Sequence, residues 1–263
     1  MEINHAKPGN FCWFELVTSD QAAAKKFYGG LFGWTANDFP MGPDSFYTMF
    51  HLRGRNVGAA YTLMPDQAKQ GVPPHWGTYV AVTNVDEGIA KAKTLGGTVV
   101  AGPMDVAEHG RMGVLRDPTG AIISVWQAKQ HQGVGLWGEA GAFCWSELMT
   151  RDTTAAAKFY TALFGWKTNV SDAAGFPYTH WQNDGADIGG MMAILEQWGP
   201  MPPSWVNYIQ VKDCDETAAK ATSLGAKVCM PPTDIPNTGR FAMLQDPLGA
   251  MFSVIALAPM RKG

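Results

Sequence analysis

FCWFELVTSDQAAAKKFYGGLFGW, at residues 11–34, returns at residues 143–166 as FCWSELMTRDTTAAAKFYTALFGW. Sixteen of the 24 aligned positions are identical, at a constant offset of 132 residues. A repeat of this length indicates internal duplication of a structural unit. In both copies an apolar, strand-like segment holds a single glutamate among aromatic residues, Glu15 in the first copy and Glu147 in the second.

Two later stretches extend the duplication. WGTYVAVTNVDEGIAKAKTLGG from residue 76 matches WVNYIQVKDCDETAAKATSLGA from residue 205, and GRMGVLRDPTGAIISVW from residue 110 matches GRFAMLQDPLGAMFSVI from residue 239, both at an offset of 129. The repeating unit is therefore about 130 residues long. Residues 129–141 are Gly-rich and aperiodic, which predicts a linker between a first domain at 1–128 and a second at 142–263.

Each half divides again into two similar modules. Residues 11–17 alternate as a strand does, and residues 21–32 place apolar side chains on one helical face. Asp20 offers a helix N-cap, and Gly33 suits the left-handed position that often follows a helix. Strand-like segments come next, and the same order recurs in each quarter of the chain. We expect an α+β fold of four βαβββ modules, at about residues 8–66, 74–128, 140–197 and 203–257.

Composition excludes several classes of protein. Hydrophobic residues make up 46% of the chain and charged residues 16%, which favours a packed core, and a net charge of −3 gives no basic surface for nucleic acid. The sequence contains no run of about 18 apolar residues, so it predicts no membrane-spanning helix. The four cysteines show no CxxC spacing, so we expect buried free thiols in a cytoplasmic protein. A small-molecule ligand is the expected partner, and the sequence leaves a homo-oligomer open.

The four modules, the helix ending LFGW and the Asp-Pro-x-Gly-Ala hairpins at 117–121 and 246–250 resemble the vicinal oxygen chelate superfamily. Glyoxalase I, bleomycin-resistance proteins and extradiol dioxygenases belong to that superfamily. The similarity covers nearly the whole chain and occurs twice. It implies that paired modules curl into an open β-cup around a ligand cavity, but a fold of this kind does not fix one reaction.

The resemblance also implies a divalent metal, held by three or four His or Glu side chains on the first and last strands of paired modules. In this chain the corresponding positions hold other residue types: Trp13, residues 58–62, Thr78 or Tyr79, and Ser124 in the first half, and Trp145, residues 189–193, Asn207 or Tyr208, and Ser253 in the second. One glutamate per cup is a poor transition-metal site. We therefore assign no metal ligand and no cofactor, although a divalent metal stays open. The six histidines are expected in surface or capping roles.

The two glutamates admit three interpretations. A carboxylate that faces an aromatic cavity would have a raised pKa and suit a general acid or base, which makes Glu15 and Glu147 candidate catalytic residues. Alternatively, Glu15 pairs with Arg111 or Arg116, and Glu147 with Arg240, in ion pairs that hold modules together. In the third interpretation the strand faces are reversed and both carboxylates lie in solvent. Duplication copies structural and catalytic residues alike, so the repeat does not distinguish between the three interpretations.

Aromatic and hydroxyl side chains near these strands complete the candidate site. We predict that they bind the substrate: Trp13, Tyr79, Ser124, Trp126, Trp145, Tyr208 and Ser253. The Gly/Pro-rich loops at 64–76 and 196–205 are candidate rims or lids of the cups. The sequence favours a lyase or isomerase that acts on a small carbonyl compound. A protein that binds an aromatic molecule without catalysis, as bleomycin-resistance proteins do, is the alternative.

Overall fold

The structure, a computed structural model, describes residues 1–43, 45–173 and 175–258. The first half contains β1 (Phe11–Thr18), α1 (Gln21–Phe32), β2 (Thr35–Gly42), β3 (Ser45–Leu52), β4 (Arg55–Thr62), α2 (Pro65–Lys69), β5 (His75–Ala81), α3 (Val85–Thr94), β6 (Thr98–Val106), β7 (Gly110–Arg116) and β8 (Ile122–Ala128). The last five residues of the second predicted domain, 259–263, lie outside the described residues.

The second half repeats this order. It contains β9 (Phe143–Thr150), α4 (Thr153–Phe164), β10 (Lys167–Ala173), β11 (Phe176–Asn183), β12 (Ala186–Ala193), the short 3-10 helix η1 (Glu196–Trp198), β13 (Ser204–Gln210), α5 (Cys214–Ser223), β14 (Lys227–Ile235), β15 (Gly239–Gln245) and β16 (Met251–Leu257). The predicted α+β class is confirmed. Among the described helices, none combines the length and apolar character needed to cross a membrane.

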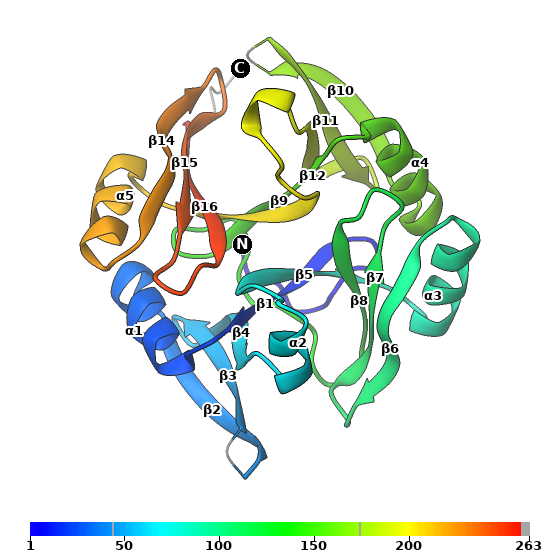
Figure 1. Ribbon diagram of the computed structural model, residues 1–263, viewed down its shortest axis with the longest axis horizontal. Coiled ribbons are helices and arrows are strands. Elements are labelled where there is room, and N and C mark those ends of the chain that lie inside the picture. Colours follow the sequence, from blue (N-terminus) through cyan, green and yellow to red (C-terminus); the bar gives the residue numbers. More distant parts are fainter. Residues whose placement is uncertain (44, 174, 259–263) are drawn as a thin grey trace.

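Each half forms one eight-stranded mixed sheet. The strand orders are β2-β3-β4-β1-β5-β8-β7-β6 and β10-β11-β12-β9-β13-β16-β15-β14. In the first sheet β1 is parallel to β4 and antiparallel to β5, so the two modules of one half join at their first strands. The same pairings place β9 between β12 and β13. Both sheets curl, and they lie on opposite sides of the molecule's centre (Figure 1). We call the concave side of each curved sheet its hollow.

The strand that carries each glutamate runs directly into a well-capped helix. Asp20 Oδ1 accepts hydrogen bonds from the backbone N–H groups of Ala22 and Ala23 and so satisfies two donors that the first turn leaves free. At the other end Gly33 adopts φ 75°, the left-handed conformation that glycine takes without strain. The predicted helix at 21–32 and both of its caps are confirmed. Packing of α1 on one face leaves the other face of β1 to the hollow.

The two halves meet through buried aromatic and acidic side chains of the repeat. The Tyr28 hydroxyl donates to Asp246 Oδ2 at 2.9 Å and accepts from Trp76 Nε1 at 2.9 Å. The second half makes the reciprocal hydrogen bond to the first, in which the Tyr160 hydroxyl donates to Asp117 Oδ2 at 2.9 Å. Helix α1 lies beside α5, and α3 beside α4, along this boundary (Figure 1). Each half therefore supplies a hydrogen-bond donor to a buried aspartate of the other half.

Two tryptophans that follow the helices seal the same boundary. Trp34 Nε1 donates to the Gly141 carbonyl at 2.7 Å, and Trp166 Nε1 donates to the Gly9 carbonyl at 2.7 Å. Both rings are buried in the main core. They serve packing between the helices and the sheets.

The segment predicted as a linker, residues 129–141, packs against β1 instead of hanging free. Val134 N–H donates to the Cys12 carbonyl at 2.8 Å, and Gly135 N–H donates to the Asn56 carbonyl at 2.7 Å. A Cβ at Gly133 would lie 2.2 Å from the Cys12 carbonyl oxygen, so only glycine permits this approach. The linker is thus fixed along the strand that carries Glu15.

Removing the inter-half tyrosine hydroxyl tests this boundary. Tyr28→Phe leaves buried Asp246 and the Trp76 indole N–H each without a partner, and we expect the free energy of unfolding to fall by about 1–3 kcal/mol. Urea denaturation measures the loss. Tyr61→Phe, which alters a partly exposed hydroxyl on β4, is the matched control and should change stability by less than about 0.5 kcal/mol. Equal stability of wild type and Tyr28→Phe would contradict the role assigned to this hydroxyl.

Candidate ligand-binding site

Glu15 lies on the inner face of the first sheet, near the middle of its central strand. Its cross-strand neighbours are small, Ala59 on β4 and Gly77 on β5. This leaves room above the strand for side chains from farther away. Tyr47 comes from β3, two strands from β1, and still reaches Glu15, as the inward curl of the sheet allows.

Two tyrosine hydroxyls hold the Glu15 carboxylate. The Tyr47 hydroxyl donates to Oε1 at 2.7 Å, and the Tyr79 hydroxyl donates to Oε2 at 2.6 Å. Trp13 Nε1 in turn donates to the Tyr47 hydroxyl at 2.9 Å. The result is a continuous chain of hydrogen bonds from an indole through a phenol to a carboxylate.

The second half builds the same cluster from the matching residues. The Tyr178 hydroxyl donates to Glu147 Oε2 at 2.7 Å and the Tyr208 hydroxyl to Oε1 at 3.1 Å, while Trp145 Nε1 donates to Tyr178 at 2.8 Å. Gly190 on β12 leaves room for the Tyr178 side chain, since a Cβ at that position would lie 1.9 Å from the Tyr178 hydroxyl oxygen. We call the four-residue sets Trp13, Glu15, Tyr47, Tyr79 and Trp145, Glu147, Tyr178, Tyr208 the first and second carboxylate clusters.

Burial sets the protonation of both clusters. Loss of solvent raises the pKa of Glu15 and of Glu147 above the ordinary value of 4.5, and the tyrosine hydrogen bonds, which lower the pKa, offset only part of this effect. Burial and the adjacent carboxylate raise the pKa of all four tyrosines well above 10. The phenols therefore remain protonated donors, and each glutamate is a carboxyl group that takes up a proton more readily than one in water.

The structure excludes the ion-pair interpretation. Arg111 pairs with Asp86 at 2.7 Å and with Asp105 at 3.0 Å, and Arg240 makes the matching pairs with aspartates of the second half. Arg116 is exposed. Arg111 and Arg240 face the helices because they alternate along β7 and β15 with the residues that point inward. Full exposure is also wrong, since Glu147 is only 6% exposed and Glu15 is half-buried.

The three other predicted binding residues lie on the strands next to the tyrosines of the clusters. Trp126 and Ser124 lie on β8, where Ser124 pairs in register with Tyr79 beside the first cluster. Ser253 occupies the equivalent position beside Tyr208, and its Oγ is buried with no hydrogen-bond partner among residues 1–43, 45–173 and 175–258. Both serines are buried. They lie on strands next to the clusters. Among the hydrogen bonds of the described residues, none joins either serine to a glutamate.

At two positions the sequence left a choice between neighbouring residues, and the structure settles it. Tyr79 and Tyr208 face the hollows, whereas Thr78 and Asn207 face the boundary between the halves. There Thr78 Oγ1 donates to Asn207 Oδ1 at 3.1 Å, and Ser146 Oγ donates to the same oxygen at 2.8 Å. These polar residues hold the two sheets together and take no part in the clusters.

Sequence reasoning missed three residues. Tyr47 and Tyr178 complete the carboxylate clusters, and a signal for them existed, because the Tyr-Thr pair at 47–48 recurs at 178–179. His131 was expected in a surface or capping role, but its ring lies edge-on to Trp13, with ring centroids 4.3 Å apart. It comes from the linker, whose path along β1 no sequence pattern reveals.

The segments that join the two modules of each half differ in their packing. In Figure 1, α2 is drawn within the curve of the first sheet and the yellow turn around η1 within the curve of the second. Trp198 and Met201 pack against a separate apolar cluster of the second half, which comprises Met149, Ile194, Val206, Tyr208 and Ile255. Helix α2 has no buried residue, and the Gln67 side-chain amide donates to the Tyr61 hydroxyl at 3.3 Å.

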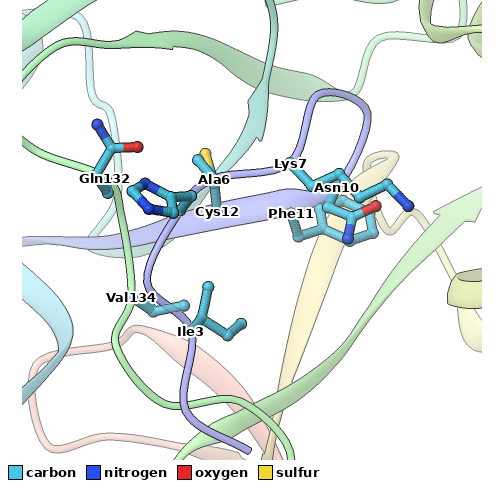
Figure 2. A pocket seen from close by; sticks show the side chains of 9 residues that line it. Ile3, Ala6, Lys7, Asn10, Phe11, Cys12, Gln132 and Val134 are labelled. Atoms are coloured by element: carbon cyan, nitrogen blue, oxygen red, sulfur yellow. The ribbon is translucent and has the colours of Figure 1, made fainter.

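Two cavities lie away from both glutamates. Figure 2 shows the smaller one, about 40 Å³, between the N-terminal segment at Ile3 and Ala6, the linker at Gln132 and Val134, and Cys12 of β1. It has room for a few water molecules but not for an organic ligand. The second is a shallow groove of about 250 Å³ between α4 and the outer faces of β10 and β11. His5 borders the smaller cavity, but no member of either carboxylate cluster lines one of these two cavities.

The residues of the clusters do not fit a divalent metal. At the positions where the superfamily carries ligands, this chain directs phenolic O–H and indole N–H donors toward the carboxylate, and such groups offer a cation no negative charge. Within the described part of the chain, no three His, Cys, Asp or Glu side chains gather as a metal site would require. The clusters suit an oxygen-bearing organic group that exchanges hydrogen bonds with phenols and a carboxyl.

Comparison with known proteins agrees with the fold. A family model described as "Glyoxalase/Bleomycin resistance protein/Dioxygenase superfamily" matches residues 3–125 and again residues 143–254. A Mycobacterium tuberculosis protein named "Putative glyoxylase CFP32" is 43% identical over 251 residues, 95% of each chain. "Anthracycline biosynthesis protein DnrV" of Streptomyces peucetius is 35% identical over 260 residues, 95% of this chain and 94% of that one. The Mn(II)-bound glyoxalase from Novosphingobium aromaticivorans superposes with a TM-score of 0.65 at 16% identity, over 95% of this chain and 83% of the other.

The raised pKa of Glu147 predicts how stability depends on pH. Because the native pKa lies above the ordinary value of 4.5, the native state binds more protons than the unfolded chain between these two values, and stability falls as pH rises through that window. Glu147→Gln removes this contribution, so its urea midpoint should vary less with pH than that of wild type. Glu196→Gln, at an exposed position on η1, is the control. Parallel curves for wild type and Glu147→Gln would contradict a desolvated carboxyl.

Proposed function

Because the chain belongs to the glyoxalase/bleomycin resistance protein/dioxygenase superfamily, we propose that it binds a small, planar, carbonyl-bearing molecule in its cups and holds the polar end of that molecule on a carboxylate cluster. The observation that carries the proposal is the hydrogen-bonded cluster of Trp, Glu and two Tyr on the inner face of each sheet, in which a partly or wholly buried carboxyl is held by phenols. A structural role alone does not require a carboxylate at a site where apolar packing is available.

The chemistry of each cluster defines the class of ligand. Indole and phenol rings offer flat apolar surface, which favours an aromatic or conjugated molecule. A ligand carbonyl accepts from a tyrosine hydroxyl, and a ligand hydroxyl donates to the carboxylate. These exchanges replace bonds that exist in the free protein, so the ligand enters without leaving buried groups unpaired. The name of the Streptomyces peucetius relative refers to anthracycline biosynthesis, and anthracyclines combine fused aromatic rings with carbonyl and hydroxyl groups.

A second function, proton transfer, is favoured by the raised pKa of the glutamates. A carboxylate of raised pKa is a better base toward carbon acids than one in water. Glu15 would take the proton from a carbon next to a carbonyl while the electron pair moves onto the carbonyl oxygen. The Tyr79 hydroxyl would donate to that developing oxyanion. When the neighbouring carbon carries a hydroxyl group, the proton of that hydroxyl passes to the oxyanion, and the protonated glutamate returns its proton to the former carbonyl carbon. The net reaction is an isomerisation that needs no oxidant, reductant or metal.

Binding of a hydroxyanthraquinone tests the first function. We expect 1,8-dihydroxyanthraquinone to quench tryptophan fluorescence on titration, and the double variant Glu15→Gln/Glu147→Gln to bind it about 10- to 100-fold more weakly, since a hydrogen bond to a charged group contributes about 1.5–3 kcal/mol. Glu216→Gln, at an exposed position on α5, should bind as wild type does. Saturable binding that is equally strong in the double glutamine variant would remove the clusters from recognition, and absence of binding by wild type would reject this ligand class.

Deuterium exchange separates a catalyst from a binder. If a glutamate acts as base, protons on the carbon next to the carbonyl of 2-hydroxyacetophenone should exchange with D2O faster in the presence of the protein, and proton NMR follows the loss of signal. The double glutamine variant should abolish the acceleration because an amide cannot accept the proton. Exchange at the uncatalysed rate with wild-type protein would leave binding as the function.

A further inference from the structure

The linker contributes a histidine to the first cup. The His131 ring centroid lies 4.3 Å from that of Trp13, at an interplanar angle of 87°, and 5.8 Å from that of Trp126. Both tryptophans belong to the inner face of the first sheet, and Trp13 is a member of the first carboxylate cluster. His131 therefore extends the wall of the cup beyond the residues that the strands supply.

Backbone hydrogen bonds hold the histidine in place. His131 N–H donates to the His109 carbonyl at 3.0 Å, and the His131 carbonyl accepts from Trp126 Nε1 at 3.0 Å. Two residues further on, Gly133 passes so close to β1 that no larger residue fits. The imidazole is thus positioned by fixed main chain on both sides.

One nitrogen of this imidazole has no partner. His131 Nε2 is buried and makes no hydrogen bond to any residue that the structure describes. Burial, with a smaller contribution from His109, lowers the pKa of His131 to about 4, so the ring is neutral at pH 7. A buried polar atom without a hydrogen-bond partner destabilises the folded protein. A bound molecule that pairs with Nε2 would recover this energy.

The two cups differ in how their own residues cover the glutamate. In the second cup Trp198 and Met201 pack over the apolar cluster, and Glu147 is 6% exposed. In the first cup α2 buries none of its residues, and Glu15 is half-buried. The carboxylate of the first cup is therefore the more accessible of the two.

We propose that the first cup is the ligand-binding site of the chain and that His131 Nε2 is a binding residue, which pairs with a hydroxyl group of a planar aromatic ligand. This inference rests on the proposed function. The carbonyl end of the ligand lies against the Tyr47 and Tyr79 hydroxyls, and its hydroxyl lies against the imidazole. Trp13 connects the two ends, because its ring contacts His131 and its Nε1 donates to the Tyr47 hydroxyl. The spacing selects ligands that carry oxygen functions at both ends.

Calorimetric titration with 1,8-dihydroxyanthraquinone tests the proposal. We expect one molecule bound per chain in wild type, binding weakened about 10-fold in His131→Phe, which keeps an aromatic ring and removes both nitrogens, and binding within twofold of wild type in Glu216→Gln, at an exposed position on α5. A Glu15→Gln variant should also lose affinity.

Other results would overturn it. Two equivalent sites per chain, or unchanged affinity in His131→Phe, would remove His131 and the preference for the first cup while the binding function stands. No binding by wild type would reject the proposed function and this inference together. Should His131→Phe fail to fold, the 15N resonances of the His131 imidazole in wild type give the same answer, since they must shift when the probe binds.

Discussion

A carboxylate on the central strand of a curved sheet, held by two tyrosine hydroxyls, is the constraint on which the rest of the site depends. A charged group in this position loses its hydration, and without partners it would destabilise the fold by several kcal/mol. The phenols of the first cluster restore hydrogen bonds at 2.6 and 2.7 Å, yet burial still raises the pKa of the glutamate. The carboxyl is therefore tolerated by the fold and also more basic than in water. Those two properties are what a polar binding point or a proton acceptor needs.

The same physics accounts for the way the duplicated halves are joined. Each half leaves a buried aspartate at its last hairpin turn, and a tyrosine from the other half donates to it. Backbone N–H groups of the turn satisfy the second carboxylate oxygen, as Leu248 and Ala250 do for Asp246. The sheets thus meet through reciprocal hydrogen bonds inside a dense aromatic core. This holds the two sheets against each other along the boundary where α1 lies beside α5 and α3 beside α4 (Figure 1).

Much of this architecture could be predicted from the residues. The repeat at 11–34 and 143–166 fixed the number of modules, Asp20 and Gly33 marked the ends of α1, and alternation along β1 placed Glu15 on the same face as Trp13. Alternation of apolar and polar residues depends only on local sequence, so it predicts the face of a strand without knowledge of the tertiary structure. The alternative in which arginines pair with the glutamates was wrong because the face of Arg111 depends on the helix that packs behind β7, where Asp86 in the first turn of α3 pairs with it.

The remaining parts of the site depend on distant segments. Tyr47 reaches Glu15 only because the sheet curls and because β4 carries Ala59 between them. His131 enters the first cup because Gly133 lets the linker touch β1. Neither the curvature of a sheet nor the path of an aperiodic segment follows from local pattern. Replacement of the superfamily's ligand positions by Trp and Tyr was visible in the sequence, but the hydrogen bonds that these residues make with the glutamate were not.

The central claim is that two glutamates are desolvated and held by tyrosine hydroxyls. Carbon-13 NMR of the glutamate side-chain carboxyls, followed through a pH titration, measures this most directly. Two carboxyl resonances, absent in Glu15→Gln and Glu147→Gln respectively, should titrate above 4.5, and each should move to still higher pH when Tyr79→Phe or Tyr208→Phe removes one donor. Titration of both carboxyls at or below 4.5, unaffected by loss of the phenols, would contradict the account.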